Sequence, residues 1–420
     1  MGFCPQGHAQ KNKINHQTKL KAHSTHFLAN SNFDLTLCSM KTKIIVVIYL
    51  LFCGFKLVFG QYDTLKVASV GDIMFHEAQY QTAQIGNTGK YNFEPSFRHV
   101  KPIFKKYDLV IGNLETTLSP TPPFSGYPQF ASPDTIAYFL KEANFNFIVT
   151  ANNHCLDRGP KGLIYTKRAL ERNHLATTGT FYNQEDRDKN YPFIWQKGNF
   201  TIAILNCTYG TNGMPITPPV KTNLIDTVQM LEDLEKAKLS KPDAIILAIH
   251  WGEEYQLFPN AFQKKIANFA FRNGVDIILG SHPHVLQPLE KQEVVYQGKK
   301  KTCYVIYSLG NFISNMRGET PRWRYTEGGI IFTFEILKHK ESGTISFQKL
   351  RYIPVWVWQE NQGLAGANFQ VLPCAKYEFD SKNLRLTDYD KRHIKQFLSD
   401  TRKHLDNRKL DFIEQNLDEY

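Results

Sequence analysis

Five short polar clusters in this sequence, made mainly of Asp, Glu, Asn and His, each come directly after a predicted strand. They are Gly71-Asp72, Asn113-Leu114-Glu115, Asn152-Asn153-His154, His250 and His282-Pro283-His284. Carboxylate and imidazole groups together are ligands that suit Mn, Fe or Zn. Two such ions lying close together can hold both the attacking and the leaving oxygen of a phosphoryl displacement. The clusters therefore predict a metal centre, provided that the fold brings them together.

Taken one at a time, the clusters also have purely structural explanations. Asp72 could be a turn residue or a helix N-cap, and Asn152-Asn153-His154 could be a loop in which Asn accepts left-handed backbone geometry. His250 on its own could be a hydrogen-bonded histidine of the core. His282-Pro283-His284 is a stronger signal, because the proline fixes the backbone between two imidazoles that can face one point. All five clusters in one chain, each at a strand end, favour the metal centre.

The elements that must position these clusters alternate along the chain from Leu65 onward. Apolar runs predict strands at 65–75, 108–113, 145–151, 243–250 and 275–280, and helices are predicted at 134–143, 161–173, 224–239 and 260–273. This alternation is typical of a layered α/β domain. In open α/β sheets ligands bind beyond the carboxyl ends of the strands, so the clusters should converge there. The Pro-rich connector 116–130 is predicted to be a loop over the site.

The second half of the chain changes to a pattern of strands without helices. A hairpin is predicted at 193–207, with its turn at 197–199, and later strands at 294–296, 303–308, 330–336 and 345–358. We therefore expect one domain over residues 61–358, followed by a partly helical C-terminal extension over 359–420. No internal repeat is present.

The N-terminal residues have the pattern of an export signal. Lys41 and Lys43 precede the apolar run Ile44–Phe55, so residues 40–60 are predicted to be a signal peptide or, if uncleaved, a membrane anchor. Residues 1–39 are polar and without periodicity, and we interpret them as a disordered extension or as sequence upstream of a true start at Met40. The protein is expected to be exported, to the periplasm, the cell surface or a membrane-anchored position.

The formal net charge of +11 does not indicate a nucleic-acid partner. Residues 1–60 hold seven Lys and a single acid, Asp34, and so carry +6 of that charge. The basic balance belongs largely to the leader, and it is poor evidence for nucleic-acid binding. The four Cys beyond the leader are too sparse for a disulfide framework, and none forms a C-x-x-C metal pair.

Several segments that contain the clusters resemble the capsule-synthesis CapA/PgsA family. They are VGDIMFH (70–76), DLVIGNLETTLS (108–119), TANNHCLDRG (150–159), LAIHWGEEY (247–255), ILGSHPHVLQPLE (278–290) and YSLGNFISN (307–315). The resemblance covers roughly residues 65–355. It implies the calcineurin-like metallophosphatase fold, which is a four-layer αββα sandwich.

The resemblance also implies a role for each site residue. Asp72 would bind the first of two divalent metal ions (Mn, Fe or Zn), and Glu115 would stand at the bridging position beside Asn113. The second ion would be held by Asn153, His250 and His282, and His284 would reach back to the first. His154 with Asp157 resembles the pair that handles the leaving-group oxygen, a general-acid role in which the imidazole needs an orienting partner.

One position departs from the pattern of many metallophosphatases. They carry a His two residues after the first Asp, where this chain has Met74. One ligand is therefore lost unless His76 replaces it, and the first ion should be weaker or differently held. The departure bears on the activity and not on the fold.

Two functions of different classes follow from the resemblance. The first is a metal-dependent, phosphoesterase-like hydrolase of capsule or poly-γ-glutamate biosynthesis, which acts on a phosphorylated intermediate or on the polymer. The alternative is a non-catalytic accessory protein that binds the acidic polymer or a synthesis and export complex. Metal content distinguishes them, because a loaded two-metal site favours the enzyme.

Overall fold

The computed structural model describes residues 60–318, 320, 323–360, 368–379, 384–406, 410 and 412–416. The predicted extension 1–39 and nearly all of the predicted signal or anchor segment 40–60 lie outside the described residues. Within the described part of the chain, no helix is long and apolar enough to cross a membrane. The fold presented below is that of the compact unit Tyr62–Tyr420.

The first half of the chain builds the parallel part of a nine-stranded sheet. Its main strand order is β18-β17-β16-β1-β2-β5-β6, with β15 paired to β1 and β19 paired to β17. Strands β1, β2, β5 and β6 run parallel, and β16, β17 and β18 continue the sheet as antiparallel neighbours. The bounds are β1 (Tyr62–Ile73), β2 (Leu109–Leu114), β5 (Phe147–Val149), β6 (Ala176–Thr178), β15 (Asn311–Ile313), β16 (Gly328–His339), β17 (Ile345–Gln359), β18 (Phe369–Pro373) and β19 (Ile413–Glu414).

A second sheet of six strands has the order β13-β14-β12-β11-β9-β8. Its central strands β9, β11, β12 and β14 are parallel, and a hairpin closes each edge. The bounds are β8 (Phe193–Lys197), β9 (Phe200–Thr208), β11 (Ala244–His250), β12 (Ile277–Ser281), β13 (Leu286–Tyr296) and β14 (Lys299–Leu309). Two short pairs complete the strands: β3 (Thr117–Ser119) with β4 (Ala131–Pro133), and β7 (Thr180–Phe181) with β10 (Lys221–Thr222).

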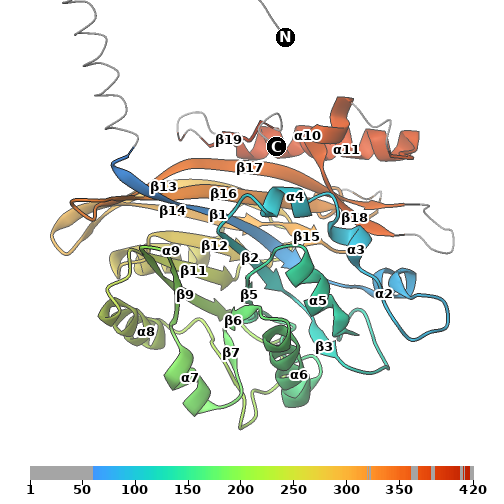
Figure 1. Cartoon of the computed structure of the whole chain (residues 1–420), viewed down its shortest axis with the longest axis horizontal. Coiled ribbons are helices and arrows are strands. Elements are labelled where there is room, and N and C mark those ends of the chain that lie inside the picture. The colour runs from blue at the N-terminus through green and yellow to red at the C-terminus, as the bar shows by residue number, and fades with distance from the viewer. Residues whose placement is uncertain are drawn as a thin grey trace, which may run out of the picture. The chain divides into compact units, whose positions relative to one another are not determined.

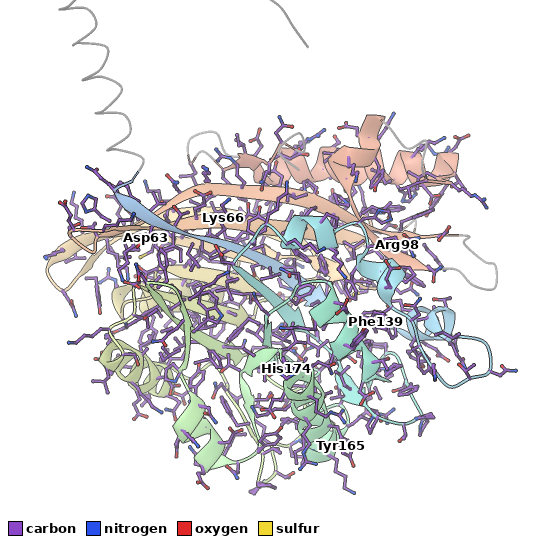
Figure 2. All side chains as sticks on the ribbon, viewed as in Figure 1. Asp63, Lys66, Arg98, Phe139, Tyr165 and His174 are labelled. Atoms are coloured by element: carbon purple, nitrogen blue, oxygen red, sulfur yellow. The ribbon has the colours of Figure 1, made fainter. Side chains whose placement is uncertain are left out.

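The two large sheets pack face to face over the largest apolar core. This core joins Val67 and Phe332 of the nine-stranded sheet to Ile246 and Ile306 of the six-stranded sheet. The strands are buried on both faces and therefore read as continuous apolar runs rather than as alternating ones. Figure 2 shows side chains filling the space between the layers.

Helices cover the two outer faces of this sandwich (Figure 1). One outer core joins the nine-stranded sheet to α2 (Glu77–Ala83), α3 (Glu94–Phe97), α4 (Lys101–Phe104), α5 (Thr135–Glu142) and α6 (Gly159–Arg172). The other joins the six-stranded sheet to α8 (Thr227–Leu239) and α9 (Ala261–Arg272), and the short helix α7 (Gln184–Asn190) precedes β8. The predicted order of layers, αββα, is confirmed by this packing.

The C-terminal residues are built into the same unit. Strand β18 extends the nine-stranded sheet beyond β17, and α10 (Cys374–Phe379) follows it. Helix α11 (Asp388–Leu405) packs against β13 and β17 and places Ile394 and Phe397 in the core between the sheets. Beyond residue 358 the sequence predicted a helical cast but no strand, so β18 was missed.

Most elements that precede the clusters were predicted to within a few residues. The hairpin at 193–207 is confirmed, since β8 and β9 turn at Gly198 with a positive φ of 55°. Helix α9 begins after Asn260, whose side chain accepts from the backbone N–H of Gln263, as a helix N-cap does. Helix α8 begins at Thr227 and not at residue 224, because Asp226 is its N-cap.

Candidate metal centre

Asp72 owes its position to the register of three neighbouring strands. It lies near the end of β1, where it pairs with Asn113 of β2 and with Asn311 of β15. Asn113 donates from Nδ2 to Asp72 Oδ1 at 2.8 Å. A Cβ atom on Gly71 would lie 2.0 Å from the carbonyl oxygen of Gly310, so only glycine permits this close approach. The Asp72 carboxylate is thereby held, fully buried, at the C-terminal end of β1.

The second sheet contributes its histidines from neighbouring strand ends. His250 is the last residue of β11 and pairs with Ser281, the last residue of β12. His282 and His284 follow β12 directly and both have positive φ, 100° and 57°, a geometry that costs free energy in residues other than glycine. The backbone N–H of His282 donates to Asp72 Oδ2 at 3.4 Å, so the loop is tied across to the first sheet.

Five of the predicted ligands meet at this junction of the two sheets. Glu115, His282 and His284 form one group whose candidate ligand atoms all lie within 4.8 Å of one another, and Asp72, Glu115 and His250 form another. Each of these side chains is at most 3% exposed. Glu115 belongs to both groups, and the resemblance gives it the bridging position. The strand-end clusters are therefore close enough to share metal ions.

The remaining predicted ligand, Asn153, lies against His250, with which the resemblance predicts that it shares the second ion. His250 Nε2 lies 2.7 Å from Asn153 Oδ1 and 3.4 Å from Glu115 Oε1. His284 Nδ1 lies 3.1 Å from Asp72 Oδ2, the pair that would share the first ion. The two compact groups divide the histidines differently, since one contains both His282 and His284. Which ligands share an ion stays a prediction.

The polar atoms at the centre fit a divalent cation. Neither carboxylate oxygen of Glu115 has a hydrogen-bond partner among the described residues, and Nδ1 of His282 has none either. A fully buried carboxylate without partners is costly, and nearly all buried polar groups in folded proteins are satisfied. A cation between Glu115 and the histidines would supply the missing partner for all three atoms.

Burial and neighbouring charges shift the pKa values of Glu115 and of the residues around it. Burial lowers the pKa of His282 to about 3, and burial together with His282 lowers the pKa of His250 well below its usual value. Burial and the neighbouring Asp72 raise the pKa of Glu115. Burial would also raise the pKa of Asp72, but the hydrogen bond and charge of His284 outweigh it and lower that pKa far below its usual value. Burial would lower the pKa of His284, but the hydrogen bond and charge of Asp72 outweigh it and raise that pKa. Neutral His250 and His282 beside an ionised Asp72 are the forms that bind metal, whereas at His284 a metal ion competes with a proton.

His154 and Asp157 form a separate pair beside the ligand groups. His154 Nδ1 lies 2.7 Å from Asp157 Oδ2, and the same oxygen accepts from the backbone N–H of Phe130 at 2.6 Å. His154 belongs to neither ligand group. Asp157 engages Nδ1, which leaves Nε2 as the ring nitrogen for a ligand. Burial raises the pKa of the neighbouring Cys155 thiol to about 11, which makes it an unreactive thiol at neutral pH.

A cavity of about 430 Å³ opens onto the centre. His154 and His284 line it together with Tyr127, which comes from the Pro-rich connector. Thr117–Ser119 of that connector, predicted to be loop, form strand β3 instead. Met74 and His76 also line the cavity. His76 belongs to neither ligand group among the described residues, and burial lowers its pKa to about 4.

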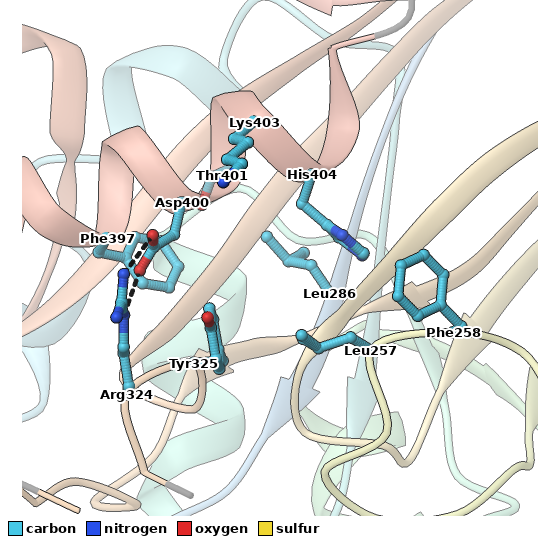
Figure 3. A pocket seen from close by; sticks show the side chains of 10 residues that line it. All are labelled: Leu257, Phe258, Leu286, Arg324, Tyr325, Phe397, Asp400, Thr401, Lys403 and His404. Atoms are coloured by element: carbon cyan, nitrogen blue, oxygen red, sulfur yellow. Dashed lines mark hydrogen bonds and ion pairs between the residues drawn. The ribbon is translucent and has the colours of Figure 1, made fainter. Parts of the chain in front are cut away.

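A second cavity, of about 460 Å³, contains none of the predicted ligands. Figure 3 shows it beneath α11, between Leu257, Phe258 and Leu286 on one side and Phe397 and His404 on the other. Its surroundings are mostly apolar, with an ion pair between Arg324 and Asp400 at its edge (Figure 3).

The sequence reasoning missed Asn311 as a site residue. Its Oδ1 lies 3.0 Å from His284 Nδ1, and its Nδ2 donates to the backbone carbonyl of Thr326. Asn311 therefore fixes the orientation of His284, as a residue behind a metal ligand commonly does. Leu309-Gly310-Asn311 repeats the pattern of Ile111-Gly112-Asn113, but the sequence does not show that this segment pairs with β1.

The chain is similar to bacterial proteins named for capsule or PGA biosynthesis. A family model described as "Bacterial capsule synthesis protein PGA_cap" matches residues 66–316. The chain is 31% identical over 298 residues to "PGA biosynthesis protein CapA" of Bacillus subtilis (strain 168), a match that covers 68% of this chain and 70% of the relative. It is 31% identical over 267 residues to "Capsule biosynthesis protein CapA" of Bacillus anthracis, over 60% of each chain.

Among solved structures, the chain is similar to the "calcineurin-like phosphoesterase YfkN from Bacillus subtilis". The TM-score is 0.40 at 13% identity, and the match covers 81% of this chain and 98% of that one. All the predicted metal ligands and the His154–Asp157 pair lie within the residues that the family model matches.

Proposed function

Since the chain belongs to the family of bacterial capsule synthesis proteins, we propose that it is a metal-dependent hydrolase of capsular polymer synthesis or export. Its site would hold two divalent ions, Mn, Fe or Zn, through Asp72, Glu115, Asn153 and the histidines 250, 282 and 284. The substrate would be a phosphorylated intermediate of the polymer or the acidic polymer itself.

The observation that carries this proposal is the state of Glu115. A carboxylate that is fully buried, lacks hydrogen-bond partners and belongs to both ligand groups calls for cations on its two oxygens. Bound ions would supply Lewis-acid polarisation of a phosphoryl oxygen and an activated water. Asp72, fixed by Asn113 and His284, holds the opposite side of the same site.

The residues of the chain itself would then manage the proton of the leaving group. Asp157 accepts from Nδ1 of His154, which fixes the ring and leaves Nε2 directed to a ligand. A protonated Nε2 would donate to the leaving oxygen as the ester bond breaks. The cavity wall formed by Tyr127 and Met74 would restrict water around that oxygen.

The biological setting remains part of the proposal. The two curated relatives are named for capsule or PGA biosynthesis, and we propose poly-γ-glutamate or a related acidic capsule as the polymer here. The signal pattern at 40–60 supports a site of action outside the cytoplasm, with the membrane reached through that segment. A synthesis or export complex would be the protein partner.

A second candidate is an accessory protein that binds the polymer without turnover. It is favoured by Met74, which stands where many metallophosphatases have a ligand histidine, and by the exclusion of His76 from both ligand groups. Such a protein would keep the scaffold and bind anions without hydrolysing them.

The two candidates are separated by assaying the metal-saturated protein against phosphomonoesters, phosphodiesters and poly-γ-glutamate. We expect hydrolysis of at least one phosphoester in excess Mn, and loss of that hydrolysis after chelation. A Mn-saturated protein that hydrolyses nothing, yet is retained on a column of acidic polymer, would overturn the hydrolase in favour of the accessory protein.

A further inference from the structure

Arg317 lies in the segment that follows β15 and passes beside the metal centre. Its Nη2 donates to the backbone carbonyl of Val357 at 2.8 Å, and its guanidinium lies 5.4 Å from the ring of Phe369. These contacts place the head group on β17 and β18, in the C-terminal part of the fold. The side chain is therefore held in place by two strands and is not a mobile surface cation.

Arg317 forms no ion pair with a described residue, although the negative charges of Glu327 and Asp390 act on it from beyond ion-pair distance. Its Nε is buried without a hydrogen-bond partner, and the bond to Val357 is its one hydrogen bond to the described residues. Two other arginines in partly buried positions have carboxylate partners: Arg187 pairs with Asp233, and Arg402 pairs with Glu378 and Glu414. For Arg317 no such ion pair is formed within the described residues. A desolvated guanidinium stays charged, and leaving it unpaired is costly.

The unpaired cation faces the same cavity as the metal centre. Arg317 lines this cavity with His76, His154 and His284. Glu254 also lines it, but it forms no ion pair with Arg317. Arg317 and His154 thus line one cavity, in which a substrate of the proposed hydrolase would lie. Arginine presents a planar fork of donors that matches phosphate and carboxylate oxygens.

We propose that Arg317 is the anion-binding residue of this cavity and holds a phosphate or carboxylate group of the ligand beside the metal centre. The ligand is then an anionic molecule whose negative charge is recognised partly by Arg317 and not by the metal ions alone. This inference rests on the proposed function for the place of the site, but it also applies to an accessory protein. Arg317 is a positioning residue, since it fixes the ligand and does not take part in proton transfer.

The test measures binding of two probes, inorganic phosphate and tri-γ-glutamate, by calorimetry to the full chain, both Mn-loaded and after EDTA treatment. We expect at least one probe to bind the metal-free wild-type protein. Its affinity should be about 10- to 100-fold weaker in Arg317→Met, because the variant loses the charged hydrogen bonds between the guanidinium and the anion. Arg317→Lys should recover part of the affinity, because it keeps the charge but loses the fork. The preferred probe identifies the anion as phosphate or carboxylate.

The matched control is Arg324→Met, because Arg324 is exposed and already paired with Asp400 at the edge of the second cavity (Figure 3). Its affinity for both probes should equal that of the wild type. If the melting temperature of Arg317→Met falls below the temperature of the assay, Arg317→Lys is compared with the wild type instead. Unchanged affinity in both Arg317 variants, or no binding of either probe by the metal-free wild type, overturns this proposal. Binding through Arg317 without any hydrolysis would overturn only the hydrolase.

Discussion

Glu115→Gln is expected to abolish metal binding while the metal-free protein stays at least as stable as the wild type. The substitution keeps the shape of the side chain and removes the one carboxylate that both ligand groups share. Metal ions normally stabilise the protein that binds them, by about 2.7 kcal/mol when the free ion is about 100-fold above its Kd. The variant should show none of this stabilisation. Without metal, however, it no longer buries an unpartnered carboxylate, so its melting temperature should not fall.

The measurement is a pair of melting curves, with excess Mn and with EDTA, alongside elemental analysis. Asp233→Asn is the matched control, since Asp233 is a buried carboxylate that pairs with Arg187 at 2.7 Å and lies outside the ligand groups. That control should keep its metal and lose stability in both conditions, because its partner is left with an unpaired charge. If Glu115→Gln instead kept its metal, or melted well below the wild type in EDTA, Glu115 would be a structural residue and not a bridging ligand.

His154→Ala is expected to lower turnover by roughly 10²–10⁴, the usual contribution of a general acid, with metal content unchanged. The reason is geometric. His154 lies outside both ligand groups, and its Nδ1 is already engaged by Asp157 at 2.7 Å. Only Nε2 remains for the substrate, so the loss should fall on kcat for esters with poor leaving groups. Turnover is measured on a phosphomonoester and a phosphodiester in excess Mn.

The control histidine is His99, which lies outside the cavity and is hydrogen-bonded to Gln370 and Tyr377. His99→Ala should leave turnover unchanged, and Asp157→Asn should lose part of the activity because the imidazole is no longer oriented. A His154→Ala variant that retains full turnover would remove the general-acid role. One that loses metal along with activity would place His154 among the ligands.

The site residues could be predicted because the sequence pattern that marks each of them lies within a short segment. Each ligand lies at the end of an apolar strand or within four residues after it, and the parallel order of β1, β2 and β5, and of β9, β11 and β12, puts these ends together. The same alternation predicted a layered α/β domain, and the family resemblance implied the αββα order of its layers, which the packing of the two sheets confirms.

The parts that could not be predicted depend on contacts between distant segments. Strand β15 has only three residues and is defined by pairing with β1 at Asp72, which places Asn311 behind His284. Helix α11 was predicted as part of an extension, but its apolar face packs into the core between the sheets. Arg317 gave no signal in the sequence, because what marks it is the absence of a carboxylate partner in the folded chain.

The most direct test of the central claim is anomalous diffraction from crystals of the wild-type protein soaked with Mn or Zn. We expect two anomalous peaks at the junction of the sheets, both within bonding distance of Glu115, with His250, His282 and His284 among the other ligands. A site that stays empty in saturating metal, or that holds a single ion away from Glu115, would contradict the two-metal centre and the hydrolase built on it.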